Sequence, residues 1–298
     1  MSGERIASVT IFPAFVALIA ALALLAPRYD LGAALGLAPD PQQPLTFVAV
    51  LGVLYALIAA AERWLPYRRE WNVGQDDART DVGHLLVNGL LTSRVASLLV
   101  YGIGIGGAAW LSIRLGVQLW PNHWPLALQL VLALAVAELG HYWFHRLTHE
   151  RPLLWRIHAA HHSAPRLYWL NATRFHPFDL FGLIVCQTLP LILLGAGAPV
   201  MVAYGLFSGA YGQLQHGNIA VRTGALRYVF STPELHRWHH SPDPREGNTN
   251  YGAVLSCWDV LFGTFFYPAD RRFRGPVGIA DAPNFPRHLG GQLLSPFR

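Results

Sequence analysis

The sequence contains no lysine. All 22 of its basic residues are arginines, so the chain has neither a Schiff-base lysine nor the lysine of a phosphate-binding P-loop. Charged residues make up only 13% of the 298 residues, against about 25% in soluble domains. Hydrophobic residues make up 53%, and they are concentrated in long runs. This composition predicts a membrane protein rather than a soluble domain with a large core.

Cysteine is also scarce. The two cysteines, Cys186 and Cys257, are far apart and form no C-x-x-C pair, which excludes a disulfide framework. The formal net charge is +5, but the arginines lie between apolar runs rather than in one basic patch. We therefore expect no nucleic-acid partner.

Six apolar segments predict an all-α fold, a polytopic membrane helix bundle. The last two are joined by the short stretch Gly-Ala-Gly-Ala-Pro at 195–199, so we expect them to be antiparallel neighbours. The six segments cover residues 9–26, 45–61, 95–113, 125–140, 178–194 and 199–214.

The arginines predict an orientation for this bundle. Most of them follow the second, fourth and sixth segments, whereas the opposite loops contain only Arg28 and Arg114. Loops rich in arginine remain on the cytoplasmic side of a membrane. The histidine-rich stretches follow the fourth and sixth segments. We therefore expect a helical metal-binding cap on the cytoplasmic side.

Histidines are abundant, and their spacing is repeated. The motif H-x-x-H-H occurs twice, and the first copy is preceded by further histidines four residues apart. Residues at i, i+3 and i+4 share one face of a helix, so each motif is expected to direct three imidazoles at one point. Imidazole is a common metal ligand, and so many exceed the capacity of one ion, which predicts a two-metal centre. The histidines concerned are His141, His145, His149, His158, His161, His162, His236, His239 and His240.

Spacing does not distinguish iron from zinc. A centre at the ends of membrane helices faces lipid, whose unactivated C–H bonds require oxygen activated at a redox metal. One alternative is a zinc-dependent hydrolase, which would need a general base such as the glutamate of H-E-x-x-H. Here Glu150 follows His149, but no second histidine completes that motif. A metal transporter or sensor is a weaker alternative, because its ligands would lie near the membrane midplane.

The histidine motifs resemble those of the fatty acid hydroxylase/sterol desaturase superfamily, across residues 81–267. The first is H-R-x-x-H at 145–149, and the others are the two H-x-x-H-H motifs at 158–162 and 236–240. Other stretches also resemble the family: His-Gly-Asn at 216–218, Asn-Tyr-Gly at 250–252, Trp-Asp at 258–259, Asn171, and His-Pro-x-Asp at 176–179.

The resemblance implies a non-haem di-iron enzyme that hydroxylates or desaturates a lipid, either an alkyl or acyl chain or a sterol-like ring. It would use O2 and electrons from outside the chain. No His-Pro-Gly-Gly segment typical of a fused cytochrome b5 is present, so a separate reductase, ferredoxin or cytochrome b5-type protein is expected. The implied metal ligands are His145, His149, His158, His161, His162, His216, His236, His239 and His240.

Four further residues are candidates for an additional ligand or for supporting the ligands: His141, His176, Glu138 and Asn218. Relatives tend to have an aromatic residue in place of His141. Glu138 is a carboxylate at membrane depth, and such residues are rare and usually functional. We expect it to pair with either an imidazole or Arg94.

The expected domains are N-terminal membrane helices with a cytoplasmic loop (1–80), the catalytic domain (81–267) and a C-terminal tail (268–298). The expected location is a bacterial inner membrane. The identity of the lipid and the oligomeric state stay open.

Overall fold

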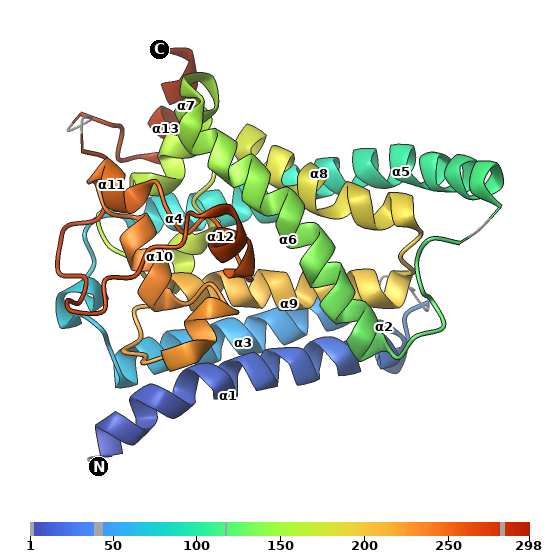
Figure 1. The fold of residues 1–298 in the computed structure, drawn as a ribbon, viewed down its shortest axis with the longest axis horizontal. Helices are drawn as coiled ribbons and strands as arrows, with labels where there is room; N and C mark the ends of the chain where they lie inside the picture. Colours follow the sequence, from blue (N-terminus) through green and yellow to red (C-terminus); the bar gives the residue numbers. More distant parts are fainter. Residues whose placement is uncertain (1–2, 39–43, 117, 281–283) are drawn as a thin grey trace.

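The computed structural model describes residues 3–38, 44–116, 118–280 and 284–298. Within these ranges the chain is helical and contains only two isolated β-bridges, Pro66 with Ile219 and Phe230 with Leu255, which confirms the all-α prediction (Figure 1). The longer helices are α1 (Gly3–Leu25), α3 (Pro44–Trp64), α5 (Ser93–Leu115), α6 (Leu126–Glu150), α7 (Pro152–His162), α8 (Pro177–Leu194) and α9 (Ala198–His216). The shorter helices are α2 (Leu31–Ala34), α4 (Ala78–Leu86), α10 (Pro233–His239), α11 (Pro244–Gly247), α12 (Cys257–Phe262) and α13 (Leu289–Leu294).

Five helices of the described chain are long and apolar enough to cross a membrane. One of them is a continuous run of α4, the π-helix Val87–Thr92 and α5. The other four are α1 with its 3₁₀ extension to Arg28, α3, α6 and α8. The sequence predicted six spans. The sixth segment is helical, as α9, but it is not among the five.

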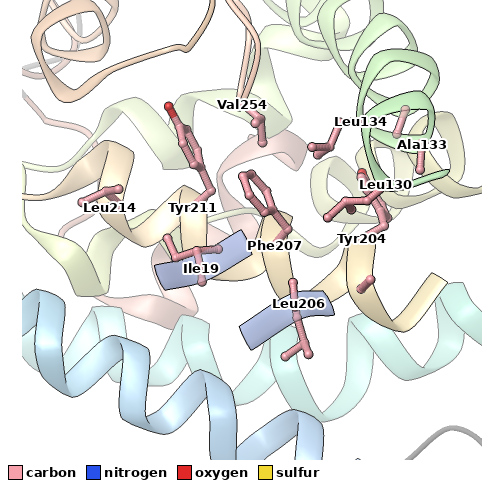
Figure 2. Packing of buried hydrophobic residues seen from close by; sticks show 14 of the residues in the cluster. Ile19, Leu130, Ala133, Leu134, Tyr204, Leu206, Phe207, Tyr211, Leu214 and Val254 are labelled. Atoms are coloured by element: carbon pink, nitrogen blue, oxygen red, sulfur yellow. The ribbon is translucent and has the colours of Figure 1, made fainter. Parts of the chain in front are cut away.

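The central position of α9 explains its composition. It packs against α1, α3 and α6, and most of its side chains are buried against protein. Figure 2 shows Phe207 and Tyr211 on one side of α9 and Leu206 on the other, and all three belong to the same buried cluster as Ile19 of α1 and Leu130 of α6. Because protein surrounds it, α9 tolerates polar groups that find partners there: the Tyr211 hydroxyl, for example, donates to the carbonyl oxygen of Ser231. Hydropathy alone therefore predicted a sixth span and did not predict that α9 packs at the centre of the bundle.

The prediction that α8 and α9 are antiparallel neighbours is wrong, because the two helices do not pack on each other. The two helices are consecutive, but α8 packs mainly on α5 and α6, whereas α9 packs on α1 and α3. α6 contacts both of them and crosses them diagonally in Figure 1. The connection at Gly195, which has φ +89°, reverses the chain direction without bringing the helices into contact along their faces.

The close approach of α6 and α8 depends on Gly140. A Cβ atom added at this position would overlap the carbonyl oxygen of Cys186 on α8. Because backbone cannot move aside as a flexible side chain can, we expect Gly140→Ala to lower the free energy of unfolding by about 1–3 kcal/mol. The measurement is unfolding in detergent. Gly102→Ala on α5 is the control, since a Cβ there meets nothing within 4 Å; equal stability of the two variants would contradict this packing.

The polar part of the molecule gathers at one end of the bundle. α10 and α11 lie at the end where the N-terminus is found, and α2 lies at the other end (Figure 1). The C-terminal ends of α6 and α9 lie at the same end as α10 and α11. α7, which packs on α6, also lies there. We call this end the cap.

Candidate metal centre

The cap brings all nine predicted ligand histidines together in two clusters. Within each cluster, one nitrogen of every imidazole lies within 4.8 Å of the others. The first cluster is His145 and His149 of α6, His158 and His162 of α7, and His239 of α10. The second is His161 at the end of α7, His216 at the end of α9, His236 of α10, and His240, which follows α10. Four segments far apart in the sequence therefore supply the donors.

Each H-x-x-H-H motif is divided between the two clusters, whereas the sequence predicted that each would direct all its imidazoles at one point. His158 and His162 join the first cluster and His161 the second. In the second motif, His239 joins the first cluster, whereas His236 and His240 join the second. At 100° per residue, positions i and i+4 are about 40° apart, whereas i+3 lies about 100° from i+4. The motif thus places adjacent histidines in neighbouring clusters.

In the first cluster, hydrogen bonds fix the orientation of four rings. Each ring donates from Nδ1 to an oxygen, so the neutral imidazole presents the lone pair of Nε2. These four Nε2 atoms are buried and have no hydrogen-bond partner. The Nδ1–acceptor pairs are His145 with the Tyr251 carbonyl (2.7 Å), His149 with Asn248 Oδ1 (3.1 Å), His158 with Asp179 Oδ2 (2.8 Å) and His239 with the Thr249 carbonyl (2.8 Å).

In the second cluster, three Nε2 atoms converge. His236 Nε2 lies 2.8 Å from His216 Nε2 and 3.0 Å from His240 Nε2. His216 is oriented by Asn171 Oδ1, 3.0 Å from its Nδ1, so its Nε2 carries a lone pair. One hydrogen cannot satisfy three converging nitrogens, and leaving buried polar atoms unpaired costs free energy. A cation at the centre of each cluster would satisfy these nitrogens, so the residues fit a pair of metal ions.

Burial keeps the cap imidazoles neutral. The pKa values of His158, His161, His162, His236, His239 and His240 are all lowered well below the usual value, first by burial and then by neighbouring histidines. Neutral imidazole is the form that binds metal.

These shifts predict a pH dependence. Because the folded-state pKa values lie below the unfolded value, folding opposes protonation, and stability falls as the pH drops below about 6.5. We expect the melting temperature of the metal-free protein to fall between pH 7 and pH 5, and that of metal-loaded protein to fall at least as much, since bound metal excludes protons from the folded state but not from the unfolded state. Thermal unfolding in detergent measures both. A metal-free protein equally stable at both pH values would contradict the burial of these imidazoles.

None of the four additional candidates belongs to either cluster. His141 is buried one turn before His145, with ring centroids 5.3 Å apart, and its Nδ1 accepts a hydrogen bond from Gln187 Nε2 at 2.7 Å. His176 caps α8: its Nδ1 accepts from the backbone N–H of Phe178, and its Nε2 donates to the Leu293 carbonyl. Neither is grouped with the other imidazoles.

Asn218 also faces away from the clusters. Its Oδ1 accepts from the backbone N–H of Arg68, and its Nδ2 donates to the Arg68 carbonyl and to Asn72 Oδ1. It therefore attaches the loop after α3 to the end of α9, two residues after His216.

Glu138 has neither of the partners expected for it. Its Oε2 accepts hydrogen bonds from three consecutive backbone N–H groups, of Ala253, Val254 and Leu255. The side chain is fully buried. Glu138 thus holds the loop whose residues Thr249 and Tyr251 orient His239 and His145.

Asp259 supports the same loop, and the sequence did not suggest this role. Its two carboxylate oxygens accept from the backbone N–H groups of Tyr251 (2.7 Å) and Gly252 (2.9 Å). The only signal was the Trp258-Asp259 pair after Asn250-Tyr251-Gly252. We refer to residues 249–255 as the clamped loop, because two buried carboxylates hold it.

Two buried ion pairs hold the segment between α7 and α8, which contains Asn171, and they too were missed. Arg166 binds Asp77 with Nε–Oδ2 at 2.7 Å, and Arg174 binds Asp81 with Nε–Oδ1 at 2.6 Å. The Tyr168 hydroxyl also donates to Asp81. Partners about ninety residues apart in sequence leave no local pattern to detect.

Comparison with known proteins gives the family. The fatty acid hydroxylase family model matches residues 130–264, which include all nine clustered histidines. The ornithine lipid hydroxylase OlsE of Rhizobium tropici is 43% identical over 243 residues, covering 81% of this chain and 72% of that protein. No solved structure matches.

Alkylglycerol monooxygenases are more distant relatives. The Danio rerio protein is 29% identical over 211 residues, covering 67% of this chain and 46% of that protein, and the Homo sapiens protein is 28% identical over 194 residues, covering 64% and 42%. The chain thus spans less than half of these longer proteins. By its family model, its bacterial relative and its histidine clusters, the chain belongs to the fatty acid hydroxylase/sterol desaturase superfamily of membrane lipid hydroxylases.

Proposed function

We propose that the chain is a di-iron lipid hydroxylase that uses O2 and external electrons. The observation that carries this proposal is the pair of adjacent, all-histidine clusters at one end of a membrane helix bundle. Iron suits imidazole ligands, and when bound it supplies the oxygen activation that an unactivated C–H bond requires.

Hydrogen bonds from neighbouring residues orient the ligand histidines toward the centres of the clusters. The clamped loop and Asp179 keep His145, His158 and His239 in the Nδ1–H form, so that Nε2 faces the cluster. Such partners orient ligands and raise their basicity. Asn171 does the same for His216 in the second cluster. Each cluster is thus set to bind one ion without rearrangement.

The lipid that the relatives favour is an ornithine lipid. The bacterial relative named as an ornithine lipid hydroxylase covers most of this chain, whereas the alkylglycerol monooxygenases share a smaller part. Both names describe hydroxylation, which favours an alcohol over an alkene as the product.

We further infer that the cap faces the cytoplasm of a bacterial inner membrane. The arginine-rich loops lead into the cap, and positive loops stay on the cytoplasmic side. The exposed arginines there, such as Arg69, Arg79 and Arg271, suit an acidic electron-donor protein, because complementary charge accelerates association.

A zinc-dependent hydrolase is less well supported. Within the described residues, neither cluster includes a carboxylate, and Asp179, whose carboxylate contacts the ring of His158, is engaged by that hydrogen bond. A general base beside a metal-bound water is therefore lacking. The clusters also lie in the cap rather than midway along the spans, which disfavours a metal transporter.

The test uses purified, iron-loaded protein in vesicles containing ornithine lipid, with a reductant system and O2. We expect a product heavier by one oxygen atom, and a further shift when ¹⁸O2 replaces O2. Cleavage of the lipid in air-free buffer would instead support the hydrolase and contradict the proposal.

A further inference from the structure

A polar pocket of about 260 Å³ lies beside the second cluster. Three parts of the chain line it: residues 75–77 before α4, residues 163 and 165 with Arg174 between α7 and α8, and part of the C-terminal segment, including residues 285–287. Its size is slightly below that of pockets for drug-sized ligands. It therefore suits a small polar group rather than a whole lipid.

The pocket lies near the membrane surface and near the metal ligands. Arg174, which lines the pocket, lies three residues before α8, the candidate span Pro177–Leu194. With a rise of about 1.5 Å per residue, this position falls close to the edge of the hydrocarbon layer. The ring of Phe175, next to Arg174, stacks on His161 with centroids 4.3 Å apart. A group bound here would be at headgroup depth and next to the second cluster.

The pocket is lined by an acidic side chain and by basic side chains that are available to a ligand. The side chains of Asp76 and Arg287 are exposed and, within the described chain, have no hydrogen-bond or ion-pair partner. Arg174 is held by Asp81 through Nε, while its Nη2 is buried and unpartnered. Asp76 also has φ +58°, a left-handed conformation that is uncommon outside glycine and is concentrated at functional sites.

We propose that this pocket binds the zwitterionic amino-acid headgroup of the lipid substrate. Asp76 would accept the headgroup amine, and Arg287 with Arg174 Nη2 would bind its carboxylate, while the acyl chains remain in the bilayer. This inference rests on the proposed function, since it names the substrate class of that same centre. Charge-assisted hydrogen bonds at both ends would select this headgroup over one with a single charge.

The test measures binding without turnover. Metal-loaded protein in detergent, without reductant, is titrated with ornithine lipid and with the same lipid after acetylation of its free amine. We expect Asp76→Asn and Arg287→Gln each to raise the Kd for ornithine lipid about tenfold. Acetylation should weaken binding to the unaltered protein about tenfold and leave the Kd of Asp76→Asn unchanged. Asp270→Asn and Arg272→Gln, exposed residues outside the pocket, should bind as the unaltered protein does.

The outcomes separate this proposal from the function itself. Oxygen insertion with unchanged Kd values in both pocket variants would overturn the headgroup site and leave the hydroxylase intact. Headgroup-dependent binding without any oxygen insertion would support the site and count against the hydroxylase. Equal binding of the acetylated lipid by the unaltered protein, or no binding of ornithine lipid, would each overturn the proposal.

Discussion

His239→Ala and His240→Ala are expected to remove different metal ions, although the two residues are adjacent. His239 belongs to the five-histidine cluster and His240 to the four-histidine cluster. Each variant should therefore lose the ion of its own cluster and retain much of the other. Because oxygen activation at a metal pair needs both ions, lipid hydroxylation should fall about 1000-fold or more in both variants.

The measurement is the iron content per chain together with a spectroscopic signature of the remaining ion. The two variants should each hold about one ion but in different environments, five imidazoles being available in one cluster and four in the other. His123→Ala is the control, since this exposed histidine lies outside the cap. Identical residual spectra would show that the two histidines serve one site and would contradict the division of the motifs.

Glu138→Ala is expected to have the second largest effect, although Glu138 lies in neither cluster. Its removal leaves the backbone N–H groups of residues 253–255 buried without their acceptor. An unsatisfied buried group costs about 1–3 kcal/mol, so the free energy of unfolding should fall by about 3 kcal/mol or more. The clamped loop would then no longer orient His145 and His239, and the metal affinity of the first cluster should fall about 10–100-fold.

Denaturant unfolding and metal titration measure these two effects. Glu138→Gln keeps an acceptor oxygen and should recover part of the loss, which a purely charge-dependent role would not allow. Glu150→Ala, on the same helix, is the control, because its carboxylate makes an exposed ion pair with Arg146, worth about 1 kcal/mol or less. Normal metal affinity in Glu138→Ala would show that the loop keeps its shape without this carboxylate.

Helical spacing predicted eight of the nine clustered histidines, because spacing is a local property, whereas His216 was added by the family resemblance. All nine predicted histidines lie in the two clusters. The division of each H-x-x-H-H motif was missed because sharing a helical face was equated with converging on a point. The 100° between His161 and His162 around α7 separates them instead. This separation brings His161 into the second cluster and leaves His162 in the first. The motif alone does not reveal that two clusters lie side by side.

The supporting residues were harder to predict, because their partners are distant in sequence. Asp179 reaches His158, and Glu138 reaches a loop more than a hundred residues away. His141 was considered as a ligand from its place on the same face as His145, but Gln187 on α8 holds its Nδ1. The fold shows the same limit: residues 199–214 were predicted to span the membrane, whereas α9 is buried among other helices, which its own sequence does not reveal.

Iron analysis of the purified protein tests the central claim most directly. The account predicts two irons per chain in the unaltered protein, and none after His145→Ala and His161→Ala are combined, since each removes a ligand from a different cluster. A single iron per chain, or zinc that remains tightly bound while lipid oxidation is absent, would contradict a di-iron centre built from these two clusters.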